Sequence, residues 1–396
     1  MRVIDSLGQG NTGTMIIALT LVATFFLAFL ITTWLIPPVQ RLCERCGWVA
    51  EPGGRRLHAH PTPTIGGIAM YVGLVVTLLA TFTFGFIDSA FQRSEFETMR
   101  IWLVILASLP IFLIMWADDV RELPALPRLL VQIIAGLIAV GSFLWTHERY
   151  LAPNAPAGSE PTEAYGILLT AFNFPFVEQI NLWNMSPWLA IGATVFWLVA
   201  MSNAINWADG ADGLAAGITL VAGITLALKA LLIEEPQFTI ALLPLTIAGV
   251  CAAFLRFNLP PARIFMGDSG AHVLGFVLGI SAIIGGAKLA TILLVLAVPI
   301  IDSAWLIVSR MVAGHSPSHG GRDHLHHRLI DLGYTPRQVL IFYYTLSTSF
   351  GLVGLSPANA YIKLALLIIL GLIVLGLIIY ANMHADNRQQ TATNDQ

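Results

Sequence analysis

The sequence contains few charged residues. Asp, Glu, Lys and Arg make up 11% of its 396 residues, whereas a typical soluble domain contains about 25%. Hydrophobic residues make up 56% of the chain. A soluble protein of this length could not cover its surface with so few charges. The composition therefore excludes a soluble globular protein and predicts an integral membrane protein.

Cysteine is also scarce, and the three cysteines are Cys43, Cys46 and Cys251. Three cysteines cannot form a disulfide framework. The pair Cys43-x-x-Cys46 has no second pair with which to build a zinc site. The net charge of −3 is too small to indicate a highly charged partner, so we expect no nucleic-acid binding.

Long apolar runs are abundant, and each is close to the length needed to cross about 30 Å of hydrocarbon. The predicted fold is an all-α polytopic membrane protein with about eleven transmembrane helices, or ten if short or adjoining runs merge. The runs lie at residues 15–36, 65–84, 101–117, 128–145, 187–204, 213–233, 237–255, 271–286, 289–311, 338–355 and 360–382. Residues 1–383 are expected to form one domain, and the polar tail 384–396 is expected to be disordered.

Eleven spans place the two termini on opposite sides of the membrane. Thirteen of the 20 Lys and Arg residues fall in loops on one side, and such an excess marks the cytoplasmic side. The N-terminus is therefore predicted to lie outside and the C-terminus in the cytoplasm.

Five loops on the cytoplasmic side carry an unusual concentration of polar residues. They follow alternate spans, so all five are expected at the same membrane surface, and the outer loops hold nothing comparable. The sequence therefore predicts one composite site open to the cytoplasm. Its loops cover residues 37–64, 117–127, 203–213, 256–270 and 310–337.

The residue types in these loops indicate metal-assisted phosphoryl transfer. Carboxylate and amide oxygens suit Mg²⁺, and guanidinium groups grip phosphate oxygens. Together with histidines they match the groups that stabilise a transferring phosphate. The candidates are Asp118, Asp119, Asn203, Asn206, Asp209, Asp212, Asp268, Arg56, Arg128, Arg322, His324, His326 and His327.

Each element also has a simpler interpretation. Asp118 and Asp119 could mark the edge of a span, and Asp209 and Asp212 could be solvated turn residues. The histidines at 315–327 could bind zinc or be inert, although contact with an anionic ligand is favoured. Asp302, inside an apolar run, is expected to be paired and either structural or supporting the site.

The five loops closely resemble the polyprenyl-phosphate N-acetylhexosamine-1-phosphate transferases, in order and spacing, over about residues 50–335. Family members move a sugar-1-phosphate from a UDP-linked amino sugar onto a polyprenyl phosphate, with Mg²⁺, and release UMP. The resemblance rests on Asp118-Asp119, Asn203-x-x-Asn206-x-x-Asp209-Gly210-x-Asp212-Gly213, Phe265-Met266-Gly267-Asp268-Ser269-Gly270 and Asp323-His324-Leu325-His326-His327-Arg328.

The last of these motifs is similar to the bacterial branch that uses UDP-N-acetylglucosamine and undecaprenyl phosphate. The resemblance thus implies a multi-pass protein of the bacterial inner membrane that starts lipid-linked cell-surface glycan synthesis. It also implies a possible homodimer.

The resemblance implies a role for each candidate. Asp268 and Asn206 would hold Mg²⁺, for which Mn²⁺ could substitute, and Asp118 and Asp119 would be catalytic, as bases or as positioning groups. Arg128 and Arg56 would contact the lipid phosphate. The nucleotide sugar and its diphosphate would contact Asn203, Asp209, Asp212, Arg322, His324, His326 and His327.

The sequence departs from the family pattern at two places. Arg128 stands where the family usually has a lysine. The run His324-Leu325-His326-His327 replaces the uninterrupted histidine triplet of the phospho-N-acetylmuramoyl-pentapeptide transferases. This difference argues against a muramyl-pentapeptide substrate, so that branch is the alternative interpretation, followed by other donors such as UDP-N-acetylgalactosamine. A membrane transporter is a remote alternative, because nearly all the acidic residues lie at one end of the spans and not at the midplane.

Overall fold

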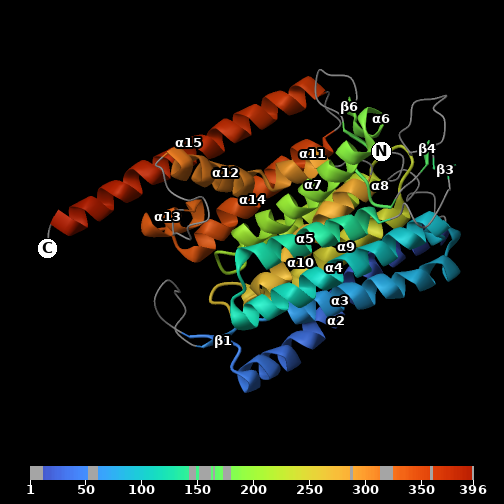
Figure 1. Cartoon of the computed structure of the whole chain (residues 1–396), viewed down its shortest axis with the longest axis horizontal. Coiled ribbons are helices and arrows are strands. Elements are labelled where there is room, and N and C mark those ends of the chain that lie inside the picture. The colour runs from blue at the N-terminus through green and yellow to red at the C-terminus, as the bar shows by residue number, and fades with distance from the viewer. Residues whose placement is uncertain are drawn as a thin grey trace.

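The computed structural model describes residues 12–51, 61–141, 149–150, 162–163, 166–172, 180–285, 289–312, 324–356 and 360–394. Over these residues the protein is an elongated bundle of helices (Figure 1). This confirms the predicted all-α class. The helices are α2 (Thr12–Cys46), α3 (Gly67–Ala80), α4 (Glu95–Arg121), α5 (Ala125–Val140), α6 (Leu182–Met185), α7 (Pro187–Ala208), α8 (Leu214–Leu231), α9 (Phe238–Asn258), α10 (Gly267–Ile284), α11 (Leu289–Val295), α12 (Ala297–Val312), α13 (Leu325–Asp331), α14 (Pro336–Leu355) and α15 (Ala360–Asn394).

Short elements connect the helices at both ends of the bundle. Two 3₁₀ helices, η1 (Thr81–Phe86) and η2 (Ser89–Phe91), lie between α3 and α4. Three antiparallel ladders of two-residue strands lie in loops, and the first pairs Val49 with Pro63 and Ala50 with Thr62. The strands are β1 (Val49–Ala50), β2 (Thr62–Pro63), β3 (Arg149–Tyr150), β4 (Thr162–Glu163), β5 (Ala171–Phe172) and β6 (Ile180–Asn181).

Eight helices of the described chain are long and apolar enough to cross a membrane. They match eight of the eleven predicted runs: α2, α3 with η1, α4, α7, α8, α9, α10 and α14. The run 128–145 corresponds to the shorter helix α5, and the run 360–382 lies within α15. α15 continues to Asn394. Much of the tail 384–396, for which the composition predicts disorder, is therefore helical in the structure.

The run 289–311 is not one span. The structure divides it into α11, a turn at Leu296, and α12. Pro299 lacks the N–H that would donate to the carbonyl of Val295, so the helix cannot continue regularly through this point. The prediction of a single uninterrupted helix over these residues is therefore not confirmed.

The helix α10 lies at the centre of the bundle and carries Asp268 in its first turn. It packs against α3, α4, α7, α8 and α9, and 83% of its apolar segment is buried. Close packing depends on glycine: a Cβ at Gly279 would lie 3.1 Å from the Cβ of Met201 on α7. Small residues commonly allow such close approach between membrane helices. α10 therefore holds Asp268 at a fixed place among its neighbours.

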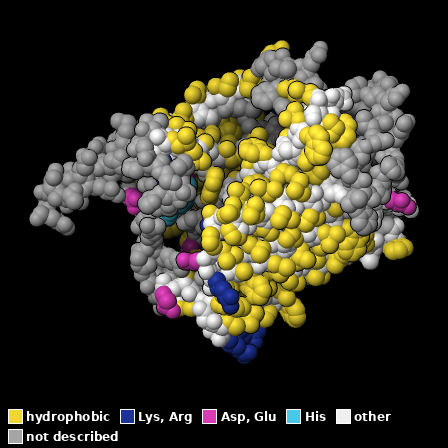
Figure 2. All heavy atoms as spheres, in the orientation of Figure 1, with side chains coloured by type: hydrophobic (Ala, Val, Ile, Leu, Met, Phe, Trp, Pro, Cys, Tyr) yellow, Lys and Arg dark blue, Asp and Glu magenta, His cyan; other side chains and the backbone are white. Residues whose placement is uncertain are grey.

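The outer surface of the bundle is apolar along its length. Figure 2 shows hydrophobic side chains covering the visible face of the helices, with charged side chains gathered at the ends. Large apolar side chains such as Trp34, Phe196 and Leu126 are more than 60% exposed. This surface is suited to lipid and agrees with a multi-pass membrane protein.

Candidate functional site

Two loops that are far apart in the sequence run side by side at one end of the bundle, the end marked by β1 and α13 in Figure 1. The backbone N–H of Phe265 donates to the carbonyl of Pro63 (2.8 Å), and that of Gly66 donates to the carbonyl of Phe265 (2.9 Å). The N–H of Gly67 donates to the carbonyl of Met266 (2.8 Å). The first and fourth of the predicted site loops therefore meet, directly before α10.

The carboxylate of Asp119 holds the start of α10. Its Oδ1 accepts from the backbone N–H of Asp268 (2.6 Å), and its Oδ2 accepts from the N–H (3.1 Å) and hydroxyl (2.6 Å) of Ser269. These N–H groups have no partner within the helix, and a negative charge is favourable at a helix N-terminus. Gly267 has φ of +72°, and a Cβ there would lie 2.6 Å from Asp119 Oδ2. Asp119 thus joins the second site loop to the fourth.

Asp268 stands between a cation and an amide. Arg128 Nη1 lies 3.3 Å from Asp268 Oδ2 and 3.1 Å from Asp118 Oδ2, so the guanidinium bridges the two carboxylates. Asn206 Nδ2 donates to Asp268 Oδ1 (2.9 Å). The side chain of Asp268 is 32% exposed, whereas that of Asp118 is 6% exposed and also accepts from the N–H of Leu123. Asp268 is therefore the accessible carboxylate of the group.

The loop 209–213 packs against the loop that precedes α10. Asp212 Oδ2 accepts from the N–H of Ala262 (2.9 Å). Asn258 accepts from the N–H of Gly213 (2.8 Å) and donates to the carbonyl of Ile264 (2.9 Å). Gly213 has φ of +79°, a conformation that suits glycine at the turn into α8.

The carboxyl group of Asp209 lies close to the other acids of the site. Loss of surrounding water raises the pKa of Asp209 well above its usual value. The neighbouring carboxylates of Asp268, Asp119 and Asp212 raise this pKa further. A bound cation would offset this repulsion between the carboxylates.

The histidine motif is attached to α12 through Asp302. Asp302 is 4% exposed, and its Oδ2 lies 2.9 Å from His324 Nδ1, while its Oδ1 accepts from the N–H of Leu325 (2.9 Å). The expectation that Asp302 is paired is confirmed. The contact fixes Nδ1 of His324 as the atom facing the carboxylate, so Nε2 is the atom left for a ligand.

His326 connects this motif to loop 209–213. A Cβ at Gly210 would lie 2.6 Å from His326 Nε2, so only glycine allows this approach. Burial lowers the pKa of His326 well below its usual value, and His327 and His324 lower it further. The ring of His326 is therefore neutral at physiological pH and stacks beside that of His324, with 5.6 Å between ring centroids.

The structure brings most of the predicted site residues together. Asp118, Asp119, Asp268, Asn206 and Arg128 contact one another directly or through one residue. Asp209, Asp212, His324 and His326 belong to the segments that border this group. Asn203 lies one helical turn from Asn206 and bonds to Gln132 (2.7 Å). Arg56 and Arg322 lie outside the described residues.

The donor set around Asp268 supplies two protein oxygens, so a divalent cation there would be completed by water and by a ligand. Within the described ranges, no three His, Cys, Asp or Glu side chains form a group that could hold a metal. Mg²⁺ is commonly bound by one or two protein oxygens together with substrate phosphates and water. The partly exposed carboxylate of Asp268 and the amide oxygen of Asn206 match this smaller requirement.

Several polar residues that contact the site were not predicted from the sequence. Ser269 donates to Asp119, and Gln132 and His272 lie buried behind Asn203. Gln132 and His272 both interrupt apolar runs, at 128–145 and 271–286. A polar residue within a span is costly unless it is paired, so this signal could have identified them.

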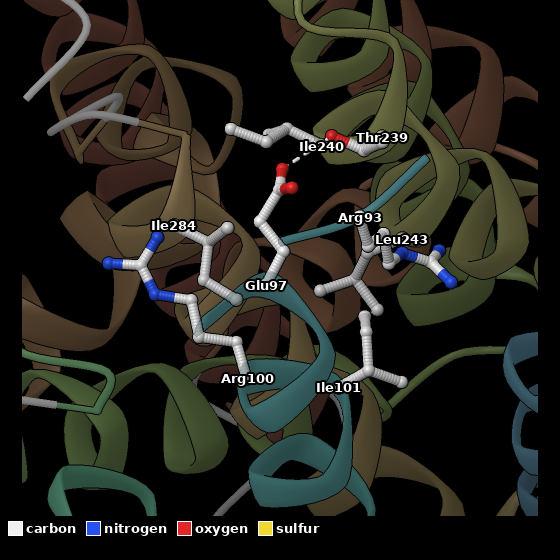
Figure 3. Close-up of a pocket in the computed structure, with 8 residues that line it drawn as sticks. All are labelled: Arg93, Glu97, Arg100, Ile101, Thr239, Ile240, Leu243 and Ile284. Carbon is white, nitrogen blue, oxygen red and sulfur yellow. Dashed lines mark hydrogen bonds between the residues drawn. The ribbon is translucent and has the colours of Figure 1, made fainter. Parts of the chain in front are cut away.

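A small pocket lies at the opposite end of the bundle and takes no part in this group (Figure 3). It is lined by the first turns of α4 and α9 and the last turn of α10. In Figure 3 the carboxylate of Glu97 points to Thr239, whose hydroxyl donates to it (2.6 Å). The guanidinium groups of Arg93 and Arg100 point away from each other. These contacts join α4 to α9 far from the acids.

Comparison with known proteins gives consistent matches. Residues 101–286 match the family model described as glycosyl transferase family 4. The chain is 28% identical over 361 residues to a probable undecaprenyl-phosphate N-acetylglucosaminyl 1-phosphate transferase of Bacillus subtilis, covering 89% of each chain. It is 31% identical over 345 residues to the decaprenyl-phosphate N-acetylglucosaminephosphotransferase of Mycobacterium tuberculosis, covering 80% of this chain and 77% of the relative.

A second group of relatives carries a different name. The chain is 28% identical over 349 residues to the phospho-N-acetylmuramoyl-pentapeptide-transferase of Desulforudis audaxviator, covering 83% of this chain and 95% of the relative.

Replacing Asp119 with alanine is expected to destabilise the ligand-free protein. The change leaves the N–H groups of Asp268 and Ser269 without their acceptor, and a buried donor without a partner costs about 1–3 kcal/mol. Thermal unfolding in detergent measures the effect. Glu44→Ala, which removes an exposed carboxylate at the same end of the bundle, is the control. An Asp119→Ala protein as stable as the control would contradict the structural role of Asp119.

Asp209→Asn is expected to stabilise the ligand-free protein at pH 8. The folded protein raises the pKa of Asp209, so ionised Asp209 opposes folding above its unfolded pKa of about 3.9. The gain should shrink as the pH falls and vanish below about 4, where both states hold the proton. Thermal unfolding at several pH values measures it. A gain that did not depend on pH would show that ionisation is not the cause.

Proposed function

The chain belongs to the polyprenyl-phosphate N-acetylhexosamine-1-phosphate transferases of glycosyl transferase family 4, and we propose from this that it transfers N-acetylglucosamine-1-phosphate from UDP-N-acetylglucosamine to undecaprenyl phosphate. UMP is the second product. The observation that carries the proposal is the partly exposed carboxylate of Asp268, held between Arg128 and Asn206 at one end of an apolar bundle. A polyprenyl phosphate has a charged phosphate at the end of an apolar chain, so its binding site must lie where polar groups meet an apolar surface.

The choice of donor rests on the relatives and on the histidine motif. Two similar relatives are named for transfer of N-acetylglucosamine phosphate. The leucine at 325 interrupts the histidine run, which favours this donor over a muramyl pentapeptide. Its side chain is buried, while its N–H bonds to Asp302. Leu325 thus serves to anchor the motif.

In the proposed reaction an oxygen of the lipid phosphate attacks the β-phosphorus of the donor. A new P–O bond forms, the bond from the β-phosphorus to the bridging oxygen breaks, and UMP leaves with that oxygen. The bond between the sugar and its phosphate stays intact. The lipid phosphate is already ionised near pH 7, since its second pKa is about 6, so no strong base is required.

The protein groups then act mainly by position and charge. Arg128 is 35% exposed beside Asp268 and is placed to bind oxygens of the lipid phosphate. Asp118 is nearly buried against Arg128 and Leu123, which supports a role in orienting the guanidinium. Both oxygens of Asp119 accept from the first turn of α10, which supports a role in placing Asp268. We therefore assign positioning roles to both aspartates, instead of proton abstraction.

Asp268 and Asn206 are the residues proposed to hold Mg²⁺, or Mn²⁺ in its place. When bound, the ion would neutralise diphosphate charge that develops on the leaving group. Asn203, Asp209 and Asp212 are proposed to border the nucleotide sugar. Arg322, His324, His326 and His327 are proposed to contact its diphosphate, and Arg56 to contact the lipid phosphate.

The lipid tail is proposed to lie along the outer face of α5. Leu126, Leu129 and Leu130 surround Arg128 in the sequence and are 64%, 44% and 48% exposed. An apolar chain could therefore continue from a phosphate at Arg128 onto a lipid-facing surface. We also propose that the protein lies in the bacterial inner membrane, as a homodimer, with its N-terminus outside and its C-terminus and site in the cytoplasm.

We expect the purified protein to release UMP from UDP-N-acetylglucosamine only when undecaprenyl phosphate and Mg²⁺ are both present. Asp268→Ala should abolish the release, because it removes the accessible carboxylate. Asp88→Ala, which removes a carboxylate before η2 at the far end of the bundle, should leave it unchanged. UMP is measured by a coupled assay in detergent.

The same assay separates the alternatives. Release with a different UDP-amino sugar alone would keep the chemistry and change the donor. No release with any donor, from a protein that unfolds cooperatively, would contradict the transferase proposal and favour transport.

The proposed orientation can be tested with cysteine labelling. Cys46 is exposed at the site end, whereas Cys43 and Cys251 are buried. A membrane-impermeant maleimide applied to intact spheroplasts should not label Cys46, but should label a cysteine introduced by Met185→Cys. Met185 is 67% exposed at the other end. Labelling of Cys46 without permeabilisation would show that the site end faces outward and would contradict the proposed orientation.

A further inference from the structure

Three helices that meet at the site each carry a second polar residue one turn deeper in the bundle. α5 carries Gln132 below Arg128, α7 carries Asn203 below Asn206, and α10 carries His272 below Asp268. The spacing of three or four residues places each pair on one helix face. We call Gln132, Asn203, His272 and the neighbouring Ser202 the lower layer.

The residues of the lower layer bond to one another across the three helices. Asn203 Nδ2 donates to Gln132 Oε1 (2.7 Å), and Gln132 Nε2 lies 3.3 Å from His272 Nδ1. Ser202 Oγ lies 3.0 Å from both His272 Nδ1 and the carbonyl of His272. Gln132, His272 and Ser202 are 2%, 3% and 0% exposed. Buried polar groups of this kind are costly unless all are paired.

One backbone carbonyl determines the orientation of this network. The carbonyl of Val199 can only accept, and Asn203 Nδ2 lies 2.8 Å from it, so the amide nitrogen of Asn203 must stand there. Gln132 must then present its oxygen to Asn203 and its nitrogen to His272. Nδ1 of His272 must therefore accept, which places the ring proton on Nε2. Both N–H groups of Asn203 are used, so its Oδ1 is the atom left to accept from a ligand.

We propose that His272, Gln132 and Ser202 are positioning residues for the transfer reaction. Through the unprotonated Nδ1 of His272 they fix the amides of Gln132 and Asn203 and hold α5, α7 and α10 in register. The register sets the distances among Arg128, Asn206 and Asp268. The inference rests on the proposed function for its kinetic consequence, but the geometry of the cation site depends on the same register whatever the donor.

The obvious alternative is that the lower layer stabilises the bundle and nothing more. Leucine in place of His272 would keep most of the volume and remove the acceptor, leaving Gln132 Nε2 without its partner. Asparagine in place of His272 would keep an acceptor, because its Oδ1 takes the position of Nδ1. The pair of variants therefore separates the hydrogen bond from the packing.

The experiment compares His272→Leu and His272→Asn with the wild type in detergent. Ser281→Ala, another buried polar residue further along α10, is the control. Three quantities are measured: the midpoint of thermal unfolding, the affinity for Mn²⁺ by electron paramagnetic resonance, and kcat and KM for UDP-N-acetylglucosamine. We expect His272→Leu to lower Mn²⁺ affinity and kcat by about 10–100-fold, the range for residues that support metal ligands. His272→Asn should restore most of both, and Ser281→Ala should change neither.

Two results would overturn the inference. One is a His272→Leu protein with a lower unfolding midpoint but unchanged Mn²⁺ affinity and kcat. The other is a His272→Asn protein as impaired as His272→Leu. If His272→Leu does not fold, Gln132→Met, which removes the same link from α5, replaces it with the same expected losses. A wild-type protein that is inactive on UDP-N-acetylglucosamine would contradict the proposed function. The Mn²⁺ measurements would still decide the role of the lower layer.

Discussion

The site depends on the carboxylate of Asp119 at the N-terminus of α10. Three hydrogen bonds from Asp268 and Ser269 fix the end of the central helix against the end of α4. That contact places the Asp268 side chain between α5 and α7, where Arg128 and Asn206 reach it. Gly267 is required because a Cβ there would meet the same carboxylate. The remaining loops then assemble around a point that is already fixed.

The architecture could be predicted to a large extent because a bilayer restricts the possible answers. Apolar runs of sufficient length must be helices, and polar loops between them must fall on alternate sides. The alternation of loops alone predicts one end of the bundle for five acids: Asp118, Asp119, Asp209, Asp212 and Asp268. This placement does not depend on how the helices pack.

The rest could not be predicted because it depends on contacts between distant segments. The break between α11 and α12 follows from Pro299, yet proline is often tolerated in membrane helices, so its presence alone did not decide the matter. Nothing local indicates that Asp119 turns inward to α10 while Asp268 stays accessible. The pairing of Gln132 with His272 joins residues 140 positions apart, and only the packed bundle brings them together.

The central claim is that this end of the bundle moves a sugar together with its phosphate. The most direct measurement uses UDP-N-acetylglucosamine that carries radioactive phosphorus in the β-phosphate and radiocarbon in the sugar. After reaction with undecaprenyl phosphate, we expect both labels in the lipid fraction in equal amounts and unlabelled UMP in solution. Sugar in the lipid with the labelled phosphate in released UDP would contradict it, because the bond broken would then be the one at the sugar.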